Sequence, residues 1–314
     1  MVDAGPTVGV VTVTYNSGKV LPDFLKSMAA QSCAKLRLYV VDNDSHDDSP
    51  ALVRAFHQQA IPTSLTVNDS NLGVAEANNQ GILAAIEDGC EFVLLLNNDT
   101  LFAPSMIVDL LREAVDGDLD IVSPLIEATD PPSTVWFSSG HLVPSQGFRT
   151  FHDGTGAPTS QFPKELRRTG YASTCALLVR KEVFDAIGIM DPVYFVYFDD
   201  VDFAVRATRA GITYWVSPAA LVTHKASSLT GGKSSDFTLR WYTRNWALIA
   251  KRHLSGPRGL MALLFIQSWM VARLVLRRDS FRVYRLRWVS FWQGVAKASA
   301  PAAPRLPSRS RGKT

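Results

Sequence analysis

The chain has 314 residues, of which 46% are hydrophobic and 19% are charged. This composition excludes a disordered or fibrous chain and predicts a globular protein with one large core. The net charge of +3 conceals an uneven distribution, because residues 251–314 hold 14 Lys and Arg against a single Asp, which leaves the preceding body acidic.

The cysteines and the N-terminus indicate a cellular compartment. Cys33, Cys90 and Cys175 lie far apart, are odd in number and show no metal-ligand spacing. This pattern favours a reducing environment over a disulfide framework. No basic region followed by a long apolar stretch opens the chain, so we predict no signal peptide and a cytoplasmic protein.

Strands and helices alternate along the first hundred residues. The predicted strands span 8–15, 36–42, 64–67 and 91–96, and the predicted helices span about 18–31, 48–59 and 74–87. Such alternation is typical of βαβ units. It predicts an α/β fold with a largely parallel, Rossmann-like sheet flanked by helices.

Each of these predicted strands ends in polar residues. The four segments are Thr14-Tyr15-Asn16, Asp42-Asn43-Asp44-Ser45, Asn68-Asp69-Ser70-Asn71 and Asn97-Asn98-Asp99. At any single position a turn or a helix cap is the simpler explanation. Four in succession predict a ligand site, because open α/β sheets bind ligands beyond the carboxyl ends of their strands.

The first of these turns excludes two common kinds of nucleotide site. Asn16-Ser17-Gly18-Lys19 has neither the dinucleotide fingerprint nor the P-loop spacing. A pyrimidine nucleotide could still bind if Asp42 accepted a hydrogen bond from the base imide and Tyr15 packed on the base. A metal would then hold the diphosphate, and Asp99 is the candidate anchor for that metal.

An aromatic run meets acidic residues within residues 194–206. Asp199 and Asp200 could simply cap the helix predicted to begin there. The adjacent rings alternatively offer a partly dry pocket in which one of these carboxylates could serve as a general base. Asp202 and Arg206 have i, i+4 spacing and are predicted to form an ion pair. His224 follows a strand-like segment, and an isolated histidine is more often structural than a ligand.

Together these motifs resemble the inverting family 2 glycosyltransferases of GT-A fold, most closely the bacterial rhamnosyltransferases of cell-surface polysaccharide synthesis. The resemblance covers about residues 8–250, with the motifs in that family's order and spacing. The motifs are residues 11–16, 41–45, 71–75 with 78–82, 95–100 and 198–202, and residues 136–140 and 244–245 add further similarity.

The resemblance implies a role for each motif. Asp42 would read the base, Asp99 and His224 would ligate Mn²⁺ or Mg²⁺, and Asp200 would deprotonate the acceptor hydroxyl. A metal would stabilise the charge on the leaving diphosphate, and one displacement would invert the anomeric carbon. The implied nucleotide-sugar-binding residues are Thr14, Tyr15, Asn16, Asp42, Asn71, Asn78, Asn97 and Asn98.

The chain also departs from the family pattern. Asn97-Asn98-Asp99 replaces two flanking aspartates, so metal binding would depend on one carboxylate and His224. Asp199 stands where Glu is frequent, which leaves the base open between Asp199 and Asp200. The predicted reaction is transfer of rhamnose from dTDP-rhamnose to a saccharide or polyprenyl-diphosphate-linked saccharide. The alternatives are a nucleotidyltransferase and a non-catalytic membrane adaptor.

The basic C-terminal region predicts contact with a membrane. Residues 260–276 are apolar but shorter than the ~20 residues of a spanning helix, so we predict that they do not cross a bilayer. Downstream, aromatic residues share one helical face beside arginines, as in a helix lying in an anionic headgroup layer. Packing on the catalytic domain is the alternative. The aromatic residues are Phe281, Tyr284, Trp288, Phe291 and Trp292, and the arginines are Arg278, Arg282 and Arg285.

Three regions are therefore predicted. Residues 1–250 form the GT-A catalytic domain, residues 251–297 a basic amphipathic helical region, and residues 298–314 a disordered tail. Within the first, residues 140–170 suit a mobile flap, with a disordered surface insertion as the alternative. Arg149, Arg167 and Arg168 are candidates for an acceptor diphosphate. We expect the protein at the inner face of the plasma membrane, with no nucleic-acid partner.

Overall fold

A computed structural model of the chain describes residues 5–32, 35–57, 61–162, 165–225, 234–299, 303–304 and 306. The first half contains β1 (Val8–Thr14), α1 (Leu21–Ala29), β2 (Leu36–Asp42), α2 (Ser49–His57), β3 (Thr63–Val67), α3 (Val74–Glu87), β4 (Phe92–Leu96), β5 (Thr100–Phe102), α4 (Met106–Asp116) and β6 (Ile121–Ala128). The second half contains β7 (Thr134–Phe137), β8 (Gly140–Val143), β9 (Arg149–His152), β10 (Arg167–Thr169), β11 (Ala176–Arg180), α5 (Lys181–Ile187), α6 (Asp199–Arg209), β12 (Tyr214–His224), α7 (Asp236–His253), α8 (Gly256–Val275) and α9 (Phe281–Lys297). Short 3₁₀ turns lie at Pro144–Gln146, Thr159–Gln161 and Pro192–Tyr194.

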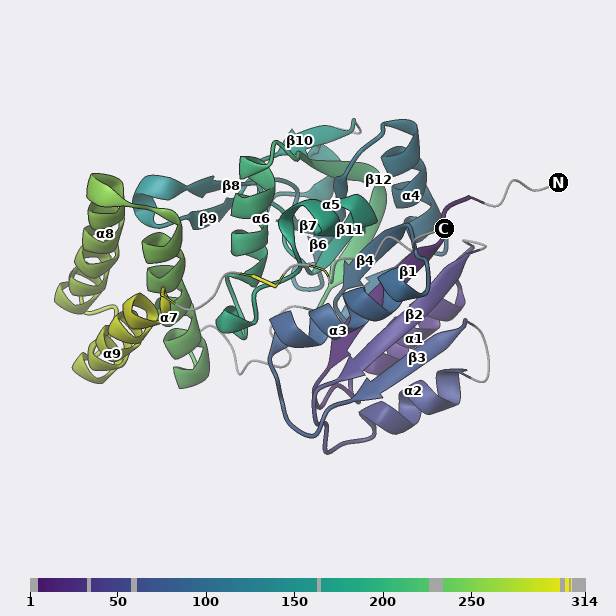
Figure 1. The fold of residues 1–314 in the computed structure, drawn as a ribbon, viewed down its shortest axis with the longest axis horizontal. Coiled ribbons are helices and arrows are strands. Elements are labelled where there is room, and N and C mark those ends of the chain that lie inside the picture. Colours follow the sequence, from purple (N-terminus) through teal and green to yellow (C-terminus); the bar gives the residue numbers. More distant parts are fainter. Residues whose placement is uncertain are drawn as a thin grey trace, which may run out of the picture.

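One large twisted sheet forms the centre of the molecule (Figure 1). Its main path runs β10-β12-β6-β11-β4-β1-β2-β3. The strands from β4 to β3 are parallel, as are β6 and β12, whereas β11 runs antiparallel between β4 and β6. The predicted mixed, mainly parallel sheet flanked by helices is confirmed.

The apolar strands explain the position of the core. All five residues of β4 are buried, as expected for a central parallel strand covered on both faces. Helix α3 lies against β1, where a Cβ added at Gly81 would stand 2.4 Å from a methyl of Val11. The predicted limits of β2 and α3 match the structure, whereas α1 is shorter than predicted because it begins only at Leu21-Pro22.

Two predicted regions differ in detail from the structure. The segment 140–170, expected to be a flap without regular structure, contains β8 and β9 as an antiparallel pair, and β10 joins the large sheet. The tail 298–314 lies mostly outside the described residues, as does Cys33. The boundary predicted at residue 250 falls inside α7, which continues to His253.

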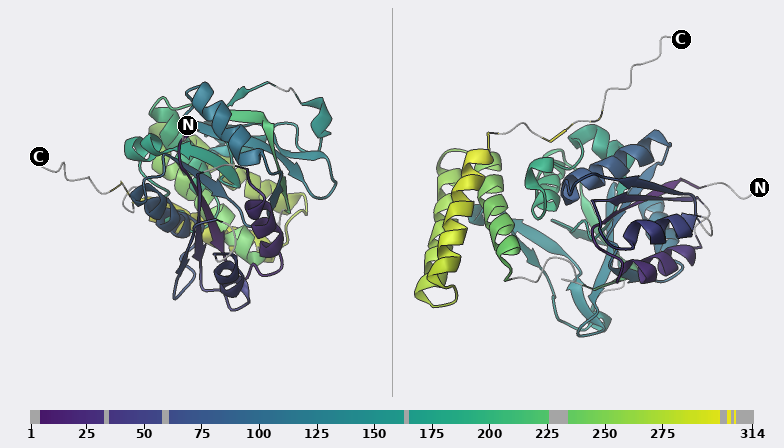
Figure 2. Two further views of the ribbon diagram at one scale, coloured as in Figure 1. Left: turned by 90° about the vertical axis from the view of Figure 1, so that its right-hand side faces the viewer. Right: turned by 90° about the horizontal axis from the view of Figure 1, so that it is seen from below.

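Helices α7, α8 and α9 stand side by side next to the sheet (Figure 2, right). At the contact between α9 and α7, Arg287 of α9 is buried and donates hydrogen bonds to Asp279 at 2.9 Å and to Thr243 of α7 at 3.1 Å. Phe291 is also buried, while Phe281, Trp288 and Trp292 remain exposed. The predicted aromatic helix therefore packs on the body through one face and leaves other rings uncovered.

Helix α8 corrects the predicted length of the apolar segment. It starts at Gly256 rather than at Leu260 and has 20 residues, and an 18-residue window within it has a mean hydropathy of 1.3. Among the described residues it is the single helix long and apolar enough to cross a membrane by length and composition. The prediction that the segment is too short was wrong, because proline is well tolerated in a first helical turn and Pro257 lies inside the helix.

The contact between α9 and α7 depends on Gly294. A Cβ at this position would stand 1.9 Å from the carbonyl oxygen of Arg244. Although alanine is the better helix former, we expect Gly294→Ala to lower the free energy of unfolding by about 1–3 kcal/mol through overpacking. Denaturant unfolding measures this loss. Gln293→Ala, on the exposed side of α9, is the matched control, and equal stability of the two variants would contradict this account of the helix contact.

Candidate active site

The ends of β1 and β2 are joined through Asp42. The Thr14 hydroxyl donates to Asp42 Oδ2 at 2.6 Å, and the Ser45 backbone N–H donates to Asp42 Oδ1 at 2.9 Å. Asp42 is fully buried. Each carboxylate oxygen can accept one more hydrogen bond, which a base could supply. Recognition of a base by Asp42 stays a prediction.

The turn after β1 lies against the loop that follows β2. The Asn16 backbone N–H donates to Ser45 Oγ, and Asn16 Oδ1 accepts from the His46 N–H, both at 2.8 Å. The Tyr15 side chain is 41% exposed. Its ring is therefore accessible to a planar ligand at this edge of the sheet.

Asparagines also shape the loop before α3. Asn71 Oδ1 accepts from the Gly73 N–H at 2.9 Å and from Asn43 Nδ2 at 3.2 Å. Asn78 is buried in α3. The sequence prediction missed its neighbour Asn79, whose side chain exchanges two 2.8 Å hydrogen bonds with the backbone of Met190.

The two asparagines after β4 occupy different environments. Asn97 is exposed, and its backbone N–H donates to the carbonyl of Cys175 at 2.8 Å. Asn98 is buried, and its side-chain amide donates to the carbonyl of Val13 and, at 3.1 Å, to Ser17 Oγ. Asn98 thus joins the ends of β1 and β4, and Asn97 presents its side chain outward.

Asp99 and His224 come together as predicted. Antiparallel pairing of β5 with β12 sets His224 opposite Thr100, and His224 Nε2 lies 3.2 Å from Asp99 Oδ1. Both side chains are almost completely buried. Burial alone would lower the pKa of His224, but the neighbouring Cys175 and the Asp99 carboxylate raise it to about 10. Without a cation, these two side chains form an ion pair.

The pair also fits a divalent cation. Two ligands each ~2.1 Å from a metal and at a right angle stand about 3 Å apart, close to the 3.2 Å observed. A carboxylate oxygen with an imidazole nitrogen suits Mn²⁺. Among the residues that the structure describes, no cluster of three or more His, Cys, Asp or Glu could hold a metal.

A row of aromatic side chains links this pair to Asp200. Trp136 meets His224 edge-on with ring centroids 4.6 Å apart, His152 lies 5.6 Å from Trp136, and Tyr171 lies 5.9 Å from His152. The Tyr171 hydroxyl then donates to Asp200 Oδ2. We call Trp136, His152 and Tyr171 the aromatic row. The sequence prediction missed His152 and Tyr171, which come from separate strands and loops.

Asp199 and Asp200 open α6 but differ in their surroundings. Asp200 is half-buried and accepts hydrogen bonds from Tyr171 and, at 2.8 Å, from the Val201 N–H. Asp199 is buried, and its Oδ2 has no hydrogen-bond partner among the residues that the structure describes. Burial and the charge of Asp200 raise the pKa of Asp199 to about 8. Burial also raises the pKa of Asp200, while the Tyr171 hydrogen bond opposes the rise. These surroundings favour Asp200 as the ionised member of the pair.

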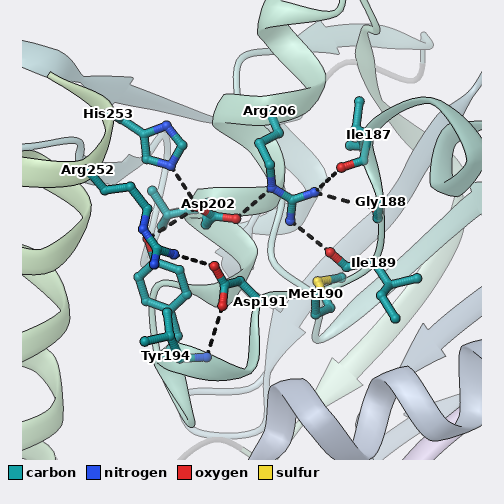
Figure 3. A network of polar contacts seen from close by, with 12 residues as sticks. Ile187, Gly188, Ile189, Met190, Asp191, Tyr194, Asp202, Arg206, Arg252 and His253 are labelled. Atoms are coloured by element: carbon teal, nitrogen blue, oxygen red, sulfur yellow. Dashed lines mark hydrogen bonds and ion pairs between the residues drawn. The ribbon is translucent and has the colours of Figure 1, made fainter. Parts of the chain in front are cut away.

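The predicted ion pair of Asp202 with Arg206 is present and belongs to a larger buried network (Figure 3). Arg206 Nε lies 2.7 Å from Asp202 Oδ2, and His253 Nε2 lies 2.7 Å from Asp202 Oδ1. Next to it, Arg252 pairs with the buried Asp191. Because Arg252 and His253 end α7, the network ties α6 to α7, which the sequence prediction did not foresee.

The three arginines predicted to meet an acceptor are separated in the structure. Arg167 donates to the carbonyl of Ser138 at 3.0 Å, and Arg168 lies over Trp215. Arg149 lies near the partly buried Tyr242: burial raises the pKa of that tyrosine, and the charge of Arg149 opposes the rise. Tyr242 in turn contacts Phe198, directly before Asp199.

Comparison with known proteins places this site in context. The sequence profile described as Glycosyl transferase family 2 matches residues 9–188. The chain is 29% identical over 305 residues to the N-acetylglucosaminyl-diphospho-decaprenol L-rhamnosyltransferase of Mycobacterium tuberculosis, covering 88% of this chain and 96% of that one. It is 28% identical over 288 residues to galactofuranosyltransferase GlfT1 of Mycolicibacterium smegmatis, covering 87% and 91%. The fold is similar to that of the mannosyltransferase PcManGT from Pyrobaculum calidifontis, solved with GDP-Man and Mn²⁺, with a TM-score of 0.56, 15% identity, and 94% and 89% coverage.

Proposed function

Because the chain belongs to glycosyl transferase family 2, we propose that it transfers rhamnose from dTDP-rhamnose, with inversion and with a divalent metal. The acceptor is a hydroxyl of a saccharide or of a polyprenyl-diphosphate-linked saccharide. Membership in the family makes the chain a glycosyltransferase. The rhamnosyl donor and the lipid-linked acceptor are supported by the name of the Mycobacterium tuberculosis relative.

One observation carries this proposal: a single row of side chains separates the Asp99–His224 pair from Asp200. A sugar nucleotide whose diphosphate lay at the pair would extend its sugar along the row toward Asp200. Asp99 and His224 would hold Mn²⁺ or Mg²⁺, which when bound supplies positive charge to the leaving diphosphate.

Asp200 has the position and the charge of a general base. Its carboxylate would accept the proton of the acceptor hydroxyl as that oxygen attacks the anomeric carbon. Tyr171 donates to Asp200 Oδ2 and orients the carboxylate. Since the base and the diphosphate site lie at opposite ends of the aromatic row, the acceptor oxygen would approach opposite to the leaving group. That direction of attack inverts the anomeric carbon.

A donor screen tests the proposal. The purified protein with Mn²⁺ and a polyprenyl-diphosphate N-acetylglucosamine acceptor is offered dTDP-rhamnose, UDP-galactofuranose, UDP-glucose, UDP-N-acetylglucosamine and GDP-mannose in separate reactions. We expect glycolipid product and nucleoside diphosphate release from dTDP-rhamnose. Product from UDP-galactofuranose alone would support the proposed glycosyl transfer but would show that the donor is UDP-galactofuranose instead of dTDP-rhamnose. Product from none of the donors would reject the proposed reaction.

Membrane contact is the second part of the proposal. Helices α8 and α9 expose large apolar side chains beside arginines, which suits an anionic lipid surface at the cytoplasmic side. We call these apolar residues the lipid face: Leu260, Met261, Leu264, Val271, Val275, Leu276, Phe281, Trp288, Val289 and Trp292. The exposed arginines on the same two helices and the turn between them are Arg258, Arg277, Arg278, Arg282 and Arg285.

Replacing Trp288 and Trp292 together with Ala tests the lipid face. We expect the partition coefficient onto phosphatidylglycerol-containing vesicles to fall at least about tenfold, a change of ~1.4 kcal/mol, and transfer to a water-soluble acceptor to stay unchanged. Vesicle sedimentation measures the binding. Val115→Ala, at an exposed apolar site on α4, is the control. Equal vesicle binding by both variants would move the membrane contact away from α9.

A further inference from the structure

The turn that precedes the catalytic acids has an unusual backbone. Phe195 has φ 62° and ψ −59°, and Tyr197 and Phe198 have φ of 64° and 67°. The N–H of Val196 donates to the carbonyl of Tyr194 at 2.7 Å, which closes a γ-turn around Phe195. Positive φ is uncommon for aromatic residues, and this form of γ-turn is rare and strained. Such a segment persists only where its surroundings hold it.

Asn245 of α7 contributes many of the contacts that keep this turn in its strained conformation. Its side chain is completely buried. Its amide nitrogen lies 2.7 Å from the carbonyl oxygen of Tyr194, 2.8 Å from that of Val196 and 2.9 Å from that of Tyr197. The two N–H groups of this one amide therefore serve three backbone carbonyls of the turn, with one hydrogen bond shared between two of them. Next to it, Arg244 Nη1 donates to the carbonyl of Val193 at 2.8 Å.

The opposite side of the turn contacts the loop before α3. The Val74 N–H donates to the carbonyl of Phe195 at 2.6 Å. A Cβ on Gly73 would stand 2.5 Å from the ring of Phe195 and 2.6 Å from its carbonyl oxygen. The loop before α3 and the turn therefore approach each other so closely that only glycine fits at position 73. Because Asn71 belongs to the same loop, the turn lies directly between the predicted donor site and Asp199.

We propose that Asn245 is a positioning residue for the catalytic acids. By holding residues 194–198 in their strained form, it fixes the start of α6 and with it Asp200 against Tyr171. This role rests on the proposed function, in which Asp200 is the base. Without the amide, three carbonyls lose their donor, and the turn relaxes toward negative φ and carries Asp200 with it. A shift of about 1 Å at a catalytic group can cost roughly 100-fold in rate.

A second buried polar residue of α7 provides a matched control. Thr243 is completely buried and accepts a hydrogen bond from Arg287 of α9 at 3.1 Å. It thus serves the contact of α7 with α9, and among the described residues its side chain makes no hydrogen bond with the turn. If Asn245 only stabilised the fold, Asn245→Ala and Thr243→Val would have the same consequences for catalysis.

The experiment compares kcat, the Kd for the donor with Mn²⁺, and the melting temperature of the full chain for wild type, Asn245→Ala and Thr243→Val. For Asn245→Ala we expect kcat to fall about 100-fold and the donor Kd to change less than about threefold. For Thr243→Val we expect a lower melting temperature and unchanged kcat. If Asn245→Ala does not fold, Asn245→Ser, which keeps one donor, is measured in the same way.

The outcomes separate the two proposals. Transfer by the wild type with equal kcat for the Asn245 and Thr243 variants would overturn the positioning role and leave the proposed function intact. A proportional loss of kcat and donor binding in the Asn245 variant would also overturn it, because the turn would then serve the donor site. No transfer by the wild type with any donor would reject the proposed function itself.

Discussion

Replacing Asp200 with Asn is expected to lower the rate of sugar transfer by about 1000-fold or more while nucleotide-sugar binding changes less than about threefold. General-base catalysis contributes typically 100- to 10,000-fold, and the amide of Asn cannot accept the proton. Asn preserves the size of the side chain and can still accept from the Tyr171 hydroxyl. Steady-state transfer and calorimetric binding of the donor measure the two quantities separately.

The neighbouring carboxylate supplies the control for this prediction. Asp199→Asn is expected to retain most of the transfer activity, because Asp199 is the buried partner whose pKa is raised to about 8 by burial and by Asp200. It is therefore largely protonated near neutral pH. If Asp199→Asn lost as much activity as Asp200→Asn, the assignment of Asp200 as the base would be contradicted, and either aspartate could be the base.

The pH dependence follows from the same pair. A general base works when deprotonated, so the rate is expected to fall as pH falls through the pKa of Asp200. Burial raises that pKa above the ordinary aspartate value of about 3.9. The acidic side of the kcat–pH profile therefore lies at higher pH than it would for an ordinary aspartate. Tyr171→Phe removes a hydrogen bond that lowers the pKa, and we expect it to shift the acid limb to still higher pH.

Replacing Asp99 with Ala is expected to lower transfer by about 100- to 1000-fold and to abolish the dependence of nucleoside diphosphate binding on Mn²⁺. The reason is that Asp99 is the carboxylate beside His224, with no cluster of three His, Cys, Asp or Glu among the described residues to replace it. Calorimetric titration of dTDP with Mn²⁺ and with EDTA measures the metal dependence without any catalytic turnover.

Two further variants make this prediction specific. His224→Ala is expected to behave like Asp99→Ala, since both side chains would hold the same cation. Asp109→Ala, which removes a carboxylate of α4 paired with Arg112, is expected to leave binding unchanged. Metal-dependent binding that survives in both Asp99→Ala and His224→Ala would show that the cation site lies elsewhere.

The sheet and its ligand edge were predictable from local sequence. The apolar run of β4 followed by Asn97-Asn98-Asp99 indicates both a buried strand and the polar edge beyond it, and the structure has β4 at Phe92–Leu96. The joining of Asp99 to His224 was predictable only through the family resemblance. Their contact depends on the pairing of β5 with β12, a long-range pairing that no local pattern encodes.

Other parts of the site had no local signal that assigned them a role, although the resemblance included residues 244–245. His152 stands in the segment interpreted as a flap and Tyr171 directly follows it, and short strands among glycines and prolines lack a clear period. Asn245 lies inside a helix, where a single polar residue is most simply a solvent-facing one. Its three carbonyl partners lie in a turn far earlier in the chain, and Tyr194 of that turn precedes Asn245 by 51 residues. Tertiary contacts of this kind are invisible to propensity and periodicity.

The buried network around Asp202 has a consequence for the order in which the protein matures during translation. Asp202 of the helix that carries Asp200 is bonded to His253, 51 residues downstream, and the turn before that helix is bonded to Asn245. A nascent chain that has emerged only through the family-matched residues 9–188 contains the donor loops but lacks both catalytic acids and their supports. Under the proposed function, competence for transfer would therefore arise only after α7 has left the ribosome and docked against α6 and its preceding turn.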